Sequence, residues 1–263
     1  MENVLRTVKF EPKPVYLLAT FWPGGGYLEH MLLRSSLTLA LATLFVSSAF
    51  ADLTSEFSVS NGNPNGAWSY GTKTSPTGVF TAFTTSGAGQ VSGPITVDFW
   101  GNSSIFNVPS AFKLTAGTLN GWSGGNGGIN VGDVSLHPGA GNEIAVVRYT
   151  VAATGLYDIS ALWGAGDGLA NGTRGAVSTE LLLNNASLFS VANTLTGQSY
   201  NSSSVSLSAG DVLDIQVGKG NDAHFYDSTP VNLSVQAVPE PASMAVLGLG
   251  ILGLARRRKA ARS

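Results

Sequence analysis

The sequence predicts an all-β protein, an antiparallel β-sandwich of jelly-roll type. Apolar and polar residues alternate with a period of two from residue 57 to residue 235, and almost no helical periodicity interrupts them. Gly, Asn and Ser separate the alternating runs, as they do in the turns of antiparallel sheets. Gly, Ser, Thr, Asn and Val are abundant and Lys and Glu are scarce, a composition that favours strands and turns.

The clearest strands lie in the second half of the chain. Residues 147–151 and 157–163 alternate on either side of the turn at 153–155, which predicts a hairpin in which Trp163 faces the core. Residues 180–183 and 186–189 flank Asn184-Asn185, the signature of a second hairpin. Three further strands are predicted at residues 205–207, 213–217 and 231–235.

The first half of the domain is less regular. Strands are predicted at residues 68–70, 79–83 and 95–99, whereas residues 101–130 look rich in loops and contain a glycine tract at 124–128. The sequence contains no internal repeat and no linker that would divide residues 52–237, so these are expected to form one domain.

Residues 31–51 have the order of a signal peptide. Met31 and Arg34 precede an apolar run at 37–46, and Ala49 and Ala51 supply the small residues that signal peptidase requires before a cut after Ala51. The run is shorter than the roughly 20 residues that a permanent span needs. Residues 1–30 lack periodicity and read as an upstream leader from a mis-assigned start codon, without a function.

The C-terminus has three consecutive parts. Val238, Pro239, Glu240 and Pro241 are followed by a glycine-containing apolar stretch at 242–255 and then by the basic residues Arg256, Arg257, Arg258 and Lys259. The two prolines prevent the last strand from continuing. The basic cluster favours a cytoplasmic C-terminus by the positive-inside rule, which leaves the domain on the other side of the membrane.

This tail resembles the PEP-CTERM sorting signal. The resemblance implies an exported protein that a membrane protease-transferase, exosortase, recognises and processes in Gram-negative bacteria that make an exopolysaccharide. The apolar stretch is then a transient membrane helix, and the domain is expected at the cell surface or outside the cell. An ordinary C-terminal anchor is the alternative reading of the same segment.

Charge and cysteine content exclude some functions. Residues 52–237 contain twelve acidic and five basic residues, a net charge of −7, so nucleic acid is not expected as a partner. The chain has no cysteine, which excludes thiolate catalysis and cysteine-ligated metals.

The residues that could carry a binding function are few. Asn221, Asp222 and Asp227 share a polar loop, with Asp211 and Asp214 in and before the preceding strand; such oxygens could hold a structural calcium ion, although turn formation is the commoner role of these residues. No other cofactor is expected. Trp122 stands in the glycine-rich loop and is the candidate for stacking on a sugar ring, with burial as the alternative.

No catalytic motif is recognisable. His137 and His224 are the histidines of residues 52–237, and neither a nucleophile elbow nor a metalloprotease helix accompanies them. The stretch from His137 to Gly218 looks like the sandwich domains of other PEP-CTERM proteins, which resemble carbohydrate-binding jelly rolls. The predicted function is therefore a non-catalytic surface or matrix protein that binds polysaccharide; the alternatives are a purely structural surface protein and a glycan-active enzyme.

Overall fold

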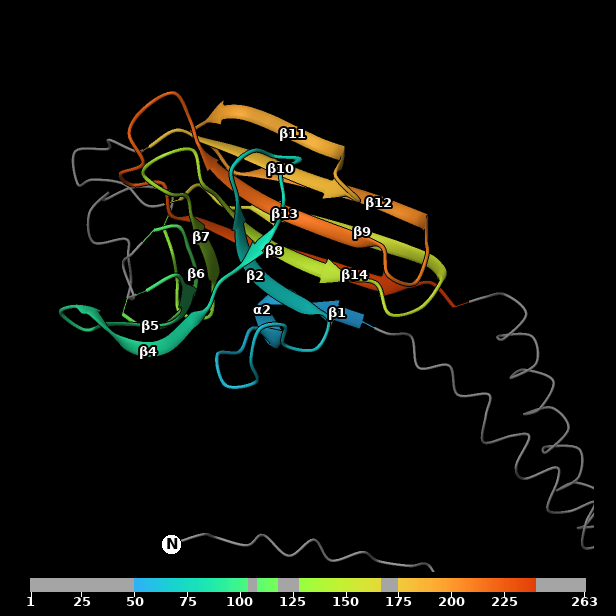
Figure 1. Cartoon of the computed structure of the whole chain (residues 1–263), viewed down its shortest axis with the longest axis horizontal. Coiled ribbons are helices and arrows are strands. Elements are labelled where there is room, and N and C mark those ends of the chain that lie inside the picture. Colours follow the sequence, from blue (N-terminus) through green and yellow to red (C-terminus); the bar gives the residue numbers. More distant parts are fainter. Residues whose placement is uncertain (1–49, 104–107, 118–127, 167–174, 240–263) are drawn as a thin grey trace, which may run out of the picture. The chain divides into compact units, whose positions relative to one another are not determined.

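The computed structural model describes residues 50–103, 108–117, 128–166 and 175–239. These residues all belong to one compact unit, which spans Ser47–Ser263. The predicted leader, the signal peptide up to Ala49 and the tail from Glu240 onward lie outside the described residues. Figure 1 shows that the regular secondary structure of the described chain is almost entirely β-strand.

The described residues contain fourteen strands and one short helix. In chain order they are β1 (Phe50–Asp52), α2 (Leu53–Glu56), β2 (Trp68–Lys73), β3 (Thr81–Ala82), β4 (Thr85–Ser92), β5 (Ile95–Gly101), β6 (Ser110–Ala116), β7 (Val134–His137), β8 (Ile144–Thr150), β9 (Gly155–Trp163), β10 (Val177–Leu183), β11 (Ala186–Thr194), β12 (Gln198–Leu207), β13 (Val212–Lys219) and β14 (Thr229–Ala237).

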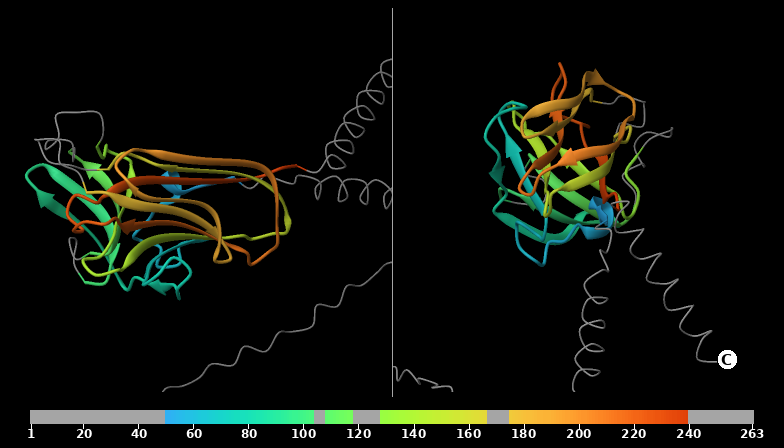
Figure 2. Two further views of the ribbon diagram at one scale, coloured as in Figure 1. Left: turned by 90° about the horizontal axis from the view of Figure 1, so that it is seen from above. Right: turned by 90° about the vertical axis from the view of Figure 1, so that its right-hand side faces the viewer.

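The last eight strands form a jelly roll, as the sequence predicts. One sheet has the order β12-β9-β14-β7 and the other the order β11-β10-β13-β8, and every neighbouring pair is antiparallel. Apart from β10 and β11, consecutive strands alternate between the two sheets, which is the path of a jelly roll. Figure 2 shows the two layers from two further directions.

The earlier strands extend both sheets on one flank. β6, β5 and β4 continue the first sheet beyond β7, while β2 and β3 continue the second beyond β8. β1 pairs with β14 at Ser234–Gln236, along the part of that strand that β7 does not reach. The predicted cut after Ala51 therefore falls inside β1, where Ala51 is buried opposite Val235.

The first predicted hairpin is wrong. β8 and β9 lie in different sheets, because the chain crosses from one layer to the other at the turn between them. Val151 exchanges backbone hydrogen bonds with Gly210 and Asp211 instead of starting a ladder with β9. Alternation identifies the two strands and their core-facing residues, but these residues can reach the core from either sheet, so alternation does not show which sheet a strand joins.

The second predicted hairpin is confirmed. β10 and β11 pair around Asn184 and Asn185, whose φ angles of 50° and 65° are those of a tight primed turn. Asparagine tolerates this left-handed conformation better than most residues. Asn184 also bonds Val212 and Asp211, which connects the hairpin to β13.

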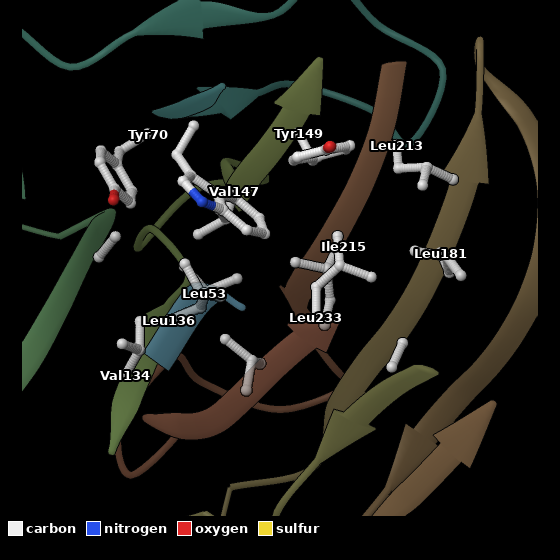
Figure 3. Packing of buried hydrophobic residues seen from close by; sticks show 14 of the residues in the cluster. Leu53, Tyr70, Val134, Leu136, Val147, Tyr149, Leu181, Leu213, Ile215 and Leu233 are labelled. Carbon is white, nitrogen blue, oxygen red and sulfur yellow. The ribbon is translucent and has the colours of Figure 1, made fainter. Parts of the chain in front are cut away.

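The core lies between the sheets. Trp68, Tyr70 and Trp163 are among its largest fully buried side chains, and Trp163 points inward as predicted. Figure 3 shows how residues of both sheets meet there: Tyr149, Leu181, Leu213, Ile215 and Leu233 pack together, and Leu53 of α2 joins them. A smaller apolar cluster covers the opposite face of β5 and β6; its members are Val97, Phe99, Phe112, Leu114 and Ile129.

The first half of the domain differs most from expectation. The strand expected at residues 79–83 is reduced to Thr81–Ala82, and β6 runs through part of the stretch that looked rich in loops. β4 also escaped prediction, because its Gly and Ala residues give no alternation to detect. A side chain at Gly87 would collide with the ring of Phe99, so close strand packing explains that glycine.

Candidate functional site

The two ends of the sandwich carry different segments of the chain. Strands β9 and β14 run antiparallel, so Leu156 lies beside Val238 at one end and Gly164 beside Pro230 at the other. Nine strand residues at about 3.3 Å each separate these ends by roughly 30 Å. We call the first the proximal end and the second, which carries the loops 164–166, 195–197 and 220–228, the distal end.

The proximal end carries the predicted sorting motif without a linker. The amide of Val238 donates a 2.8 Å hydrogen bond to the carbonyl oxygen of Leu156, and Pro239 is exposed immediately after it. β1 enters the sheet at the same end, because Phe50 pairs with Gln236. The segments that precede Phe50 and follow Pro239 therefore leave the sandwich at neighbouring points. Glu240, Pro241 and the basic residues 256–259 lie outside the described residues.

The predicted calcium residues lie at the distal end. Asp222 accepts a hydrogen bond from the amide of Ala176 at 3.1 Å, and the amide of Asn221 donates to Asn193 at 3.0 Å. Asp227 is 1% exposed and its carboxylate lies directly against Gly175, where any Cβ would overlap it. The loop thus brings these residues to the same short segment, where Asp222 has the role of a turn-stabilising side chain.

The two acidic residues named beside this loop lie elsewhere. Asp211 is at the proximal end, where the amides of Ser208 and Asn184 lower its pKa by hydrogen bonding. Asp214 is buried in the middle of β13. Across residues 50–103, 108–117, 128–166 and 175–239, no group of three or more His, Cys, Asp or Glu side chains could hold a metal ion. Calcium binding stays a prediction.

The aromatic side chains that could contact a sugar differ in their exposure to solvent. Trp68, Trp100 and Trp163 are buried, and Trp122 lies outside the described residues. The exposed aromatic at the distal end is Phe225, which is 62% exposed. Phe225 was not predicted from the sequence, because no sequence pattern marks an exposed phenylalanine in a loop.

Two histidines adjoin this phenylalanine. The ring of His224 lies 4.4 Å from that of Phe225 and 6.2 Å from that of His137, centroid to centroid. Burial lowers the pKa of His137 to about 4, although the nearby carbonyl of Pro138 opposes the change. His137 is therefore neutral at neutral pH. A small pocket opens beside this group, with a lining that includes Gly164, Gly175, Thr194, Thr196, Tyr226 and Thr229.

A buried ion cluster on the outer face of the second sheet was not predicted. Asp214 accepts hydrogen bonds from Nε and Nη2 of Arg148 at 2.7 and 2.9 Å. Nζ of Lys73 lies 2.7 Å from Oδ2 of Asp214. Lys73 also donates to Pro76 and Asn185. The guanidinium of Arg148 lies 4.2 Å from the ring centre of Phe80. These contacts hold the segment between β2 and β3 against the sheet, which is a structural role.

The family comparison concerns the proximal end. Residues 237–259 match the family model described as the PEP-CTERM protein-sorting motif. The chain carries a PEP-CTERM sorting motif at its C-terminus. The match begins at Ala237, the last residue of β14, so the PEP-CTERM motif and the jelly roll share their boundary. A PEP-CTERM motif implies export, passage through the membrane and sorting to the cell surface by exosortase.

The helix predicted within the PEP-CTERM segment lies outside the described residues. None of the helices that the structure describes has the length and apolar character needed to span a membrane, and residues 242–255 lie outside the described part. No curated protein matches the sequence.

Several solved structures have a low similarity to the chain. Rabbit GITRL is 17% identical, with 36% of this chain and 75% of that chain covered and a TM-score of 0.27. The Podospora anserina GH26-CBM35 β-(1,4)-mannanase is 20% identical, with coverages of 45% and 24% and a TM-score of 0.27. A family 35 carbohydrate-binding module from an environmental isolate is 15% identical, with coverages of 46% and 85% and a TM-score of 0.23. Scores this low carry no argument about a ligand.

Proposed function

We propose that the chain is a non-catalytic protein of the cell surface or extracellular matrix that contacts extracellular polysaccharide with the distal end of its jelly roll. Signal peptidase removes residues 31–51, and the apolar stretch 242–255 then holds the domain at the membrane until exosortase acts near Pro239. The observation that carries the proposal is the attachment of the sorting motif to the last strand.

The position of the sorting motif at the proximal end supports an arrangement in which the distal end faces away from the membrane. Because the amide of Val238 is hydrogen-bonded to Leu156, the sorting motif follows the last strand directly at the proximal end. The loops around Asn221, Phe225 and Gly175 lie at the far end of the same strands. A domain tethered in this way presents those loops to the extracellular matrix.

Two aromatic side chains are the candidates for sugar contact. Phe225 is exposed in the same loop as the amide of Asn221 and the carboxylate of Asp222, and an apolar face together with hydrogen-bonding groups suits a sugar ring. Trp122 remains the candidate from the sequence. The competing proposal is a purely structural surface protein, and the burial of Trp68, Trp100 and Trp163 favours it, because these rings serve the core.

Polysaccharide binding is tested with the protein released from the cell surface of its host. We expect the protein to be retained on the exopolysaccharide of that host, and Phe225→Ala or Trp122→Ala to reduce retention severalfold. Leu156→Ala is the matched control, since it removes an exposed apolar side chain at the proximal end. Retention that neither Phe225→Ala nor Trp122→Ala weakens would contradict the proposed contact, and absence of retention would leave the structural role.

The non-catalytic part of the proposal has a separate test. The same protein is incubated with the exopolysaccharide and the formation of new reducing ends is measured. We expect none above a boiled control. Steady release of reducing ends would show a glycan-active enzyme instead.

A further inference from the structure

Within the described residues, one flank of the jelly roll ends without added strands. β2–β3 and β6–β5–β4 extend the sheets at the β7/β8 flank, whereas β12 and β11 are the terminal strands of their sheets at the other flank. The two terminal strands meet there through Phe189 and Tyr200, whose ring centres are 6.2 Å apart. Figure 1 shows β11 at the border of the sandwich.

This flank has no charged side chains of its own. Between Glu180 and Asp211 the sequence contains no Asp, Glu, Lys, Arg or His, although 11% of the whole chain is charged. Terminal strands of soluble sheets are normally protected by charges, especially Lys, or by Pro. Neither β11 nor β12 contains a proline. Charges and prolines, two of the features that prevent strand pairing between molecules, are therefore absent from β11 and β12.

Apolar side chains lie on both faces beside β12. Phe189 stacks on Trp163 and is only partly buried, as are Leu188, Tyr200 and Val205. On the other face Leu162, which pairs with Ser199, is 53% exposed. A partner strand along β12 would cover both sets.

The geometry selects β12 over β11 as the pairing strand. β11 has two register shifts against β10, and Asn193 near its end has a φ of 55°, so its outer edge is irregular. β12 pairs regularly with β9 from Gln198 to Ser202, and its bulge comes after Ser202. A regular run of five residues offers its outward N–H and C=O groups in register.

We propose that β12 pairs antiparallel with β12 of a second copy of this chain, around a twofold axis near Tyr200. A second copy fits as the partner because β11 and β12 contain no charged residue, so two domains with a net charge of −7 each can meet along these strands without placing like charges of the strands in contact. An antiparallel pair of identical strands is self-complementary, as a twofold interface requires. The two first sheets then form one continuous sheet.

Cross-linking on the full chain in its host tests this arrangement. The chain has no cysteine, so one introduced thiol is the sole reactive site. Ser199→Cys and Asn201→Cys are exposed on β12, and Ala88→Cys is the matched control on β4, the terminal strand of the same sheet at the opposite flank. We expect a short bifunctional maleimide to produce a dimer with both β12 variants and little with Ala88→Cys.

A charge substitution provides the second readout. Asn201→Lys puts two like charges together across the twofold axis and should weaken the dimer at least about tenfold in sedimentation of the detergent-solubilised chain. Ala88→Lys should leave the dimer unchanged, and the melting temperatures of both variants report folding. A monomeric wild type, equal cross-linking at Ala88, or an unaffected Asn201→Lys dimer would each overturn the proposal. None of these outcomes depends on polysaccharide binding.

Discussion

Val238, the second residue of the family match, makes the last backbone hydrogen bond of the β14–β9 ladder, to Leu156 at 2.8 Å. The family match thus begins within the folded sheet, and Pro239 is exposed immediately after Val238. Proline cannot donate to the ladder, so the sheet ends where the motif becomes accessible. Sorting and folding therefore share one boundary.

The buried carboxylate of Asp214 should be essential for stability. Asp214→Ala removes the partner of Lys73, whose side chain is fully buried, and leaves an uncompensated charge on the outer face of the second sheet. Breaking a buried pair by removing one partner costs about 3–5 kcal/mol. Denaturant unfolding should show this loss, and the double variant Lys73→Met/Asp214→Leu should recover most of it. A loss below about 1 kcal/mol, the range of exposed ion pairs, would contradict the structural role.

His137 should make the stability of the protein depend on pH. Its folded pKa of about 4 lies below the ordinary value of 6.5, so the unfolded state binds a proton more tightly than the folded state between these values. The contribution of His137 to the free energy of unfolding is therefore fully present above about pH 6.5 and is lost as the pH falls toward 4. Each tenfold difference in proton affinity corresponds to about 1.4 kcal/mol, so the loss should approach 3 kcal/mol.

The variant His137→Asn tests this dependence. It keeps a hydrogen-bonding group near Pro138 but cannot be protonated, so its stability should change less between pH 6.5 and 4 than that of the wild type. His224→Asn is the control, since it leaves the buried imidazole of His137 in place. Equal pH profiles for His137→Asn and the wild type would assign the dependence to other groups.

Most strands of the second half were predictable from sequence, whereas in the first half the strands expected at residues 68–70 and 95–99 are confirmed as β2 and β5 and the others were missed or misplaced. Apolar and polar residues alternate along β9, β13 and β14, so the core-facing residues of these strands follow from local sequence. Asn184-Asn185 likewise indicates the turn between β10 and β11. Which sheet a strand joins depends on contacts far apart in sequence, and this is why the pairing expected for β8 and β9 was wrong. β4 has too few large side chains to show a pattern at all.

The site was predictable only at the proximal end. Val238 to Pro241 form a contiguous motif that the family comparison confirms. Asp214 could not be assigned from sequence, because its partners Lys73 and Arg148 come from two other strands. Phe225 is exposed through loop geometry, which single residues do not encode.

The calcium prediction concerns the distal loop. If Asn221, Asp222 and Asp227 hold the ion, it stabilises the folded state by about 2.7 kcal/mol at a hundredfold excess over Kd. This should raise the melting temperature by about 5–10 °C in calcium relative to EDTA. Asp222→Asn keeps an oxygen for the amide of Ala176 but removes the charge, so it should diminish the rise. Identical melting temperatures in calcium and EDTA would leave these residues a role in the turn alone.

If exosortase recognises the motif that follows β14, processing of the protein should depend on that motif. The most direct measurement is the size and location of the protein when Pro239, Glu240 and Pro241 are replaced by alanine. The apolar stretch and the basic residues remain, so we expect an unprocessed form that stays in the inner membrane. Pro230→Ala, a proline substitution in the same strand outside the motif, should still be processed and reach the surface. A triple-alanine variant that is processed and reaches the surface as efficiently as the wild type would contradict the account.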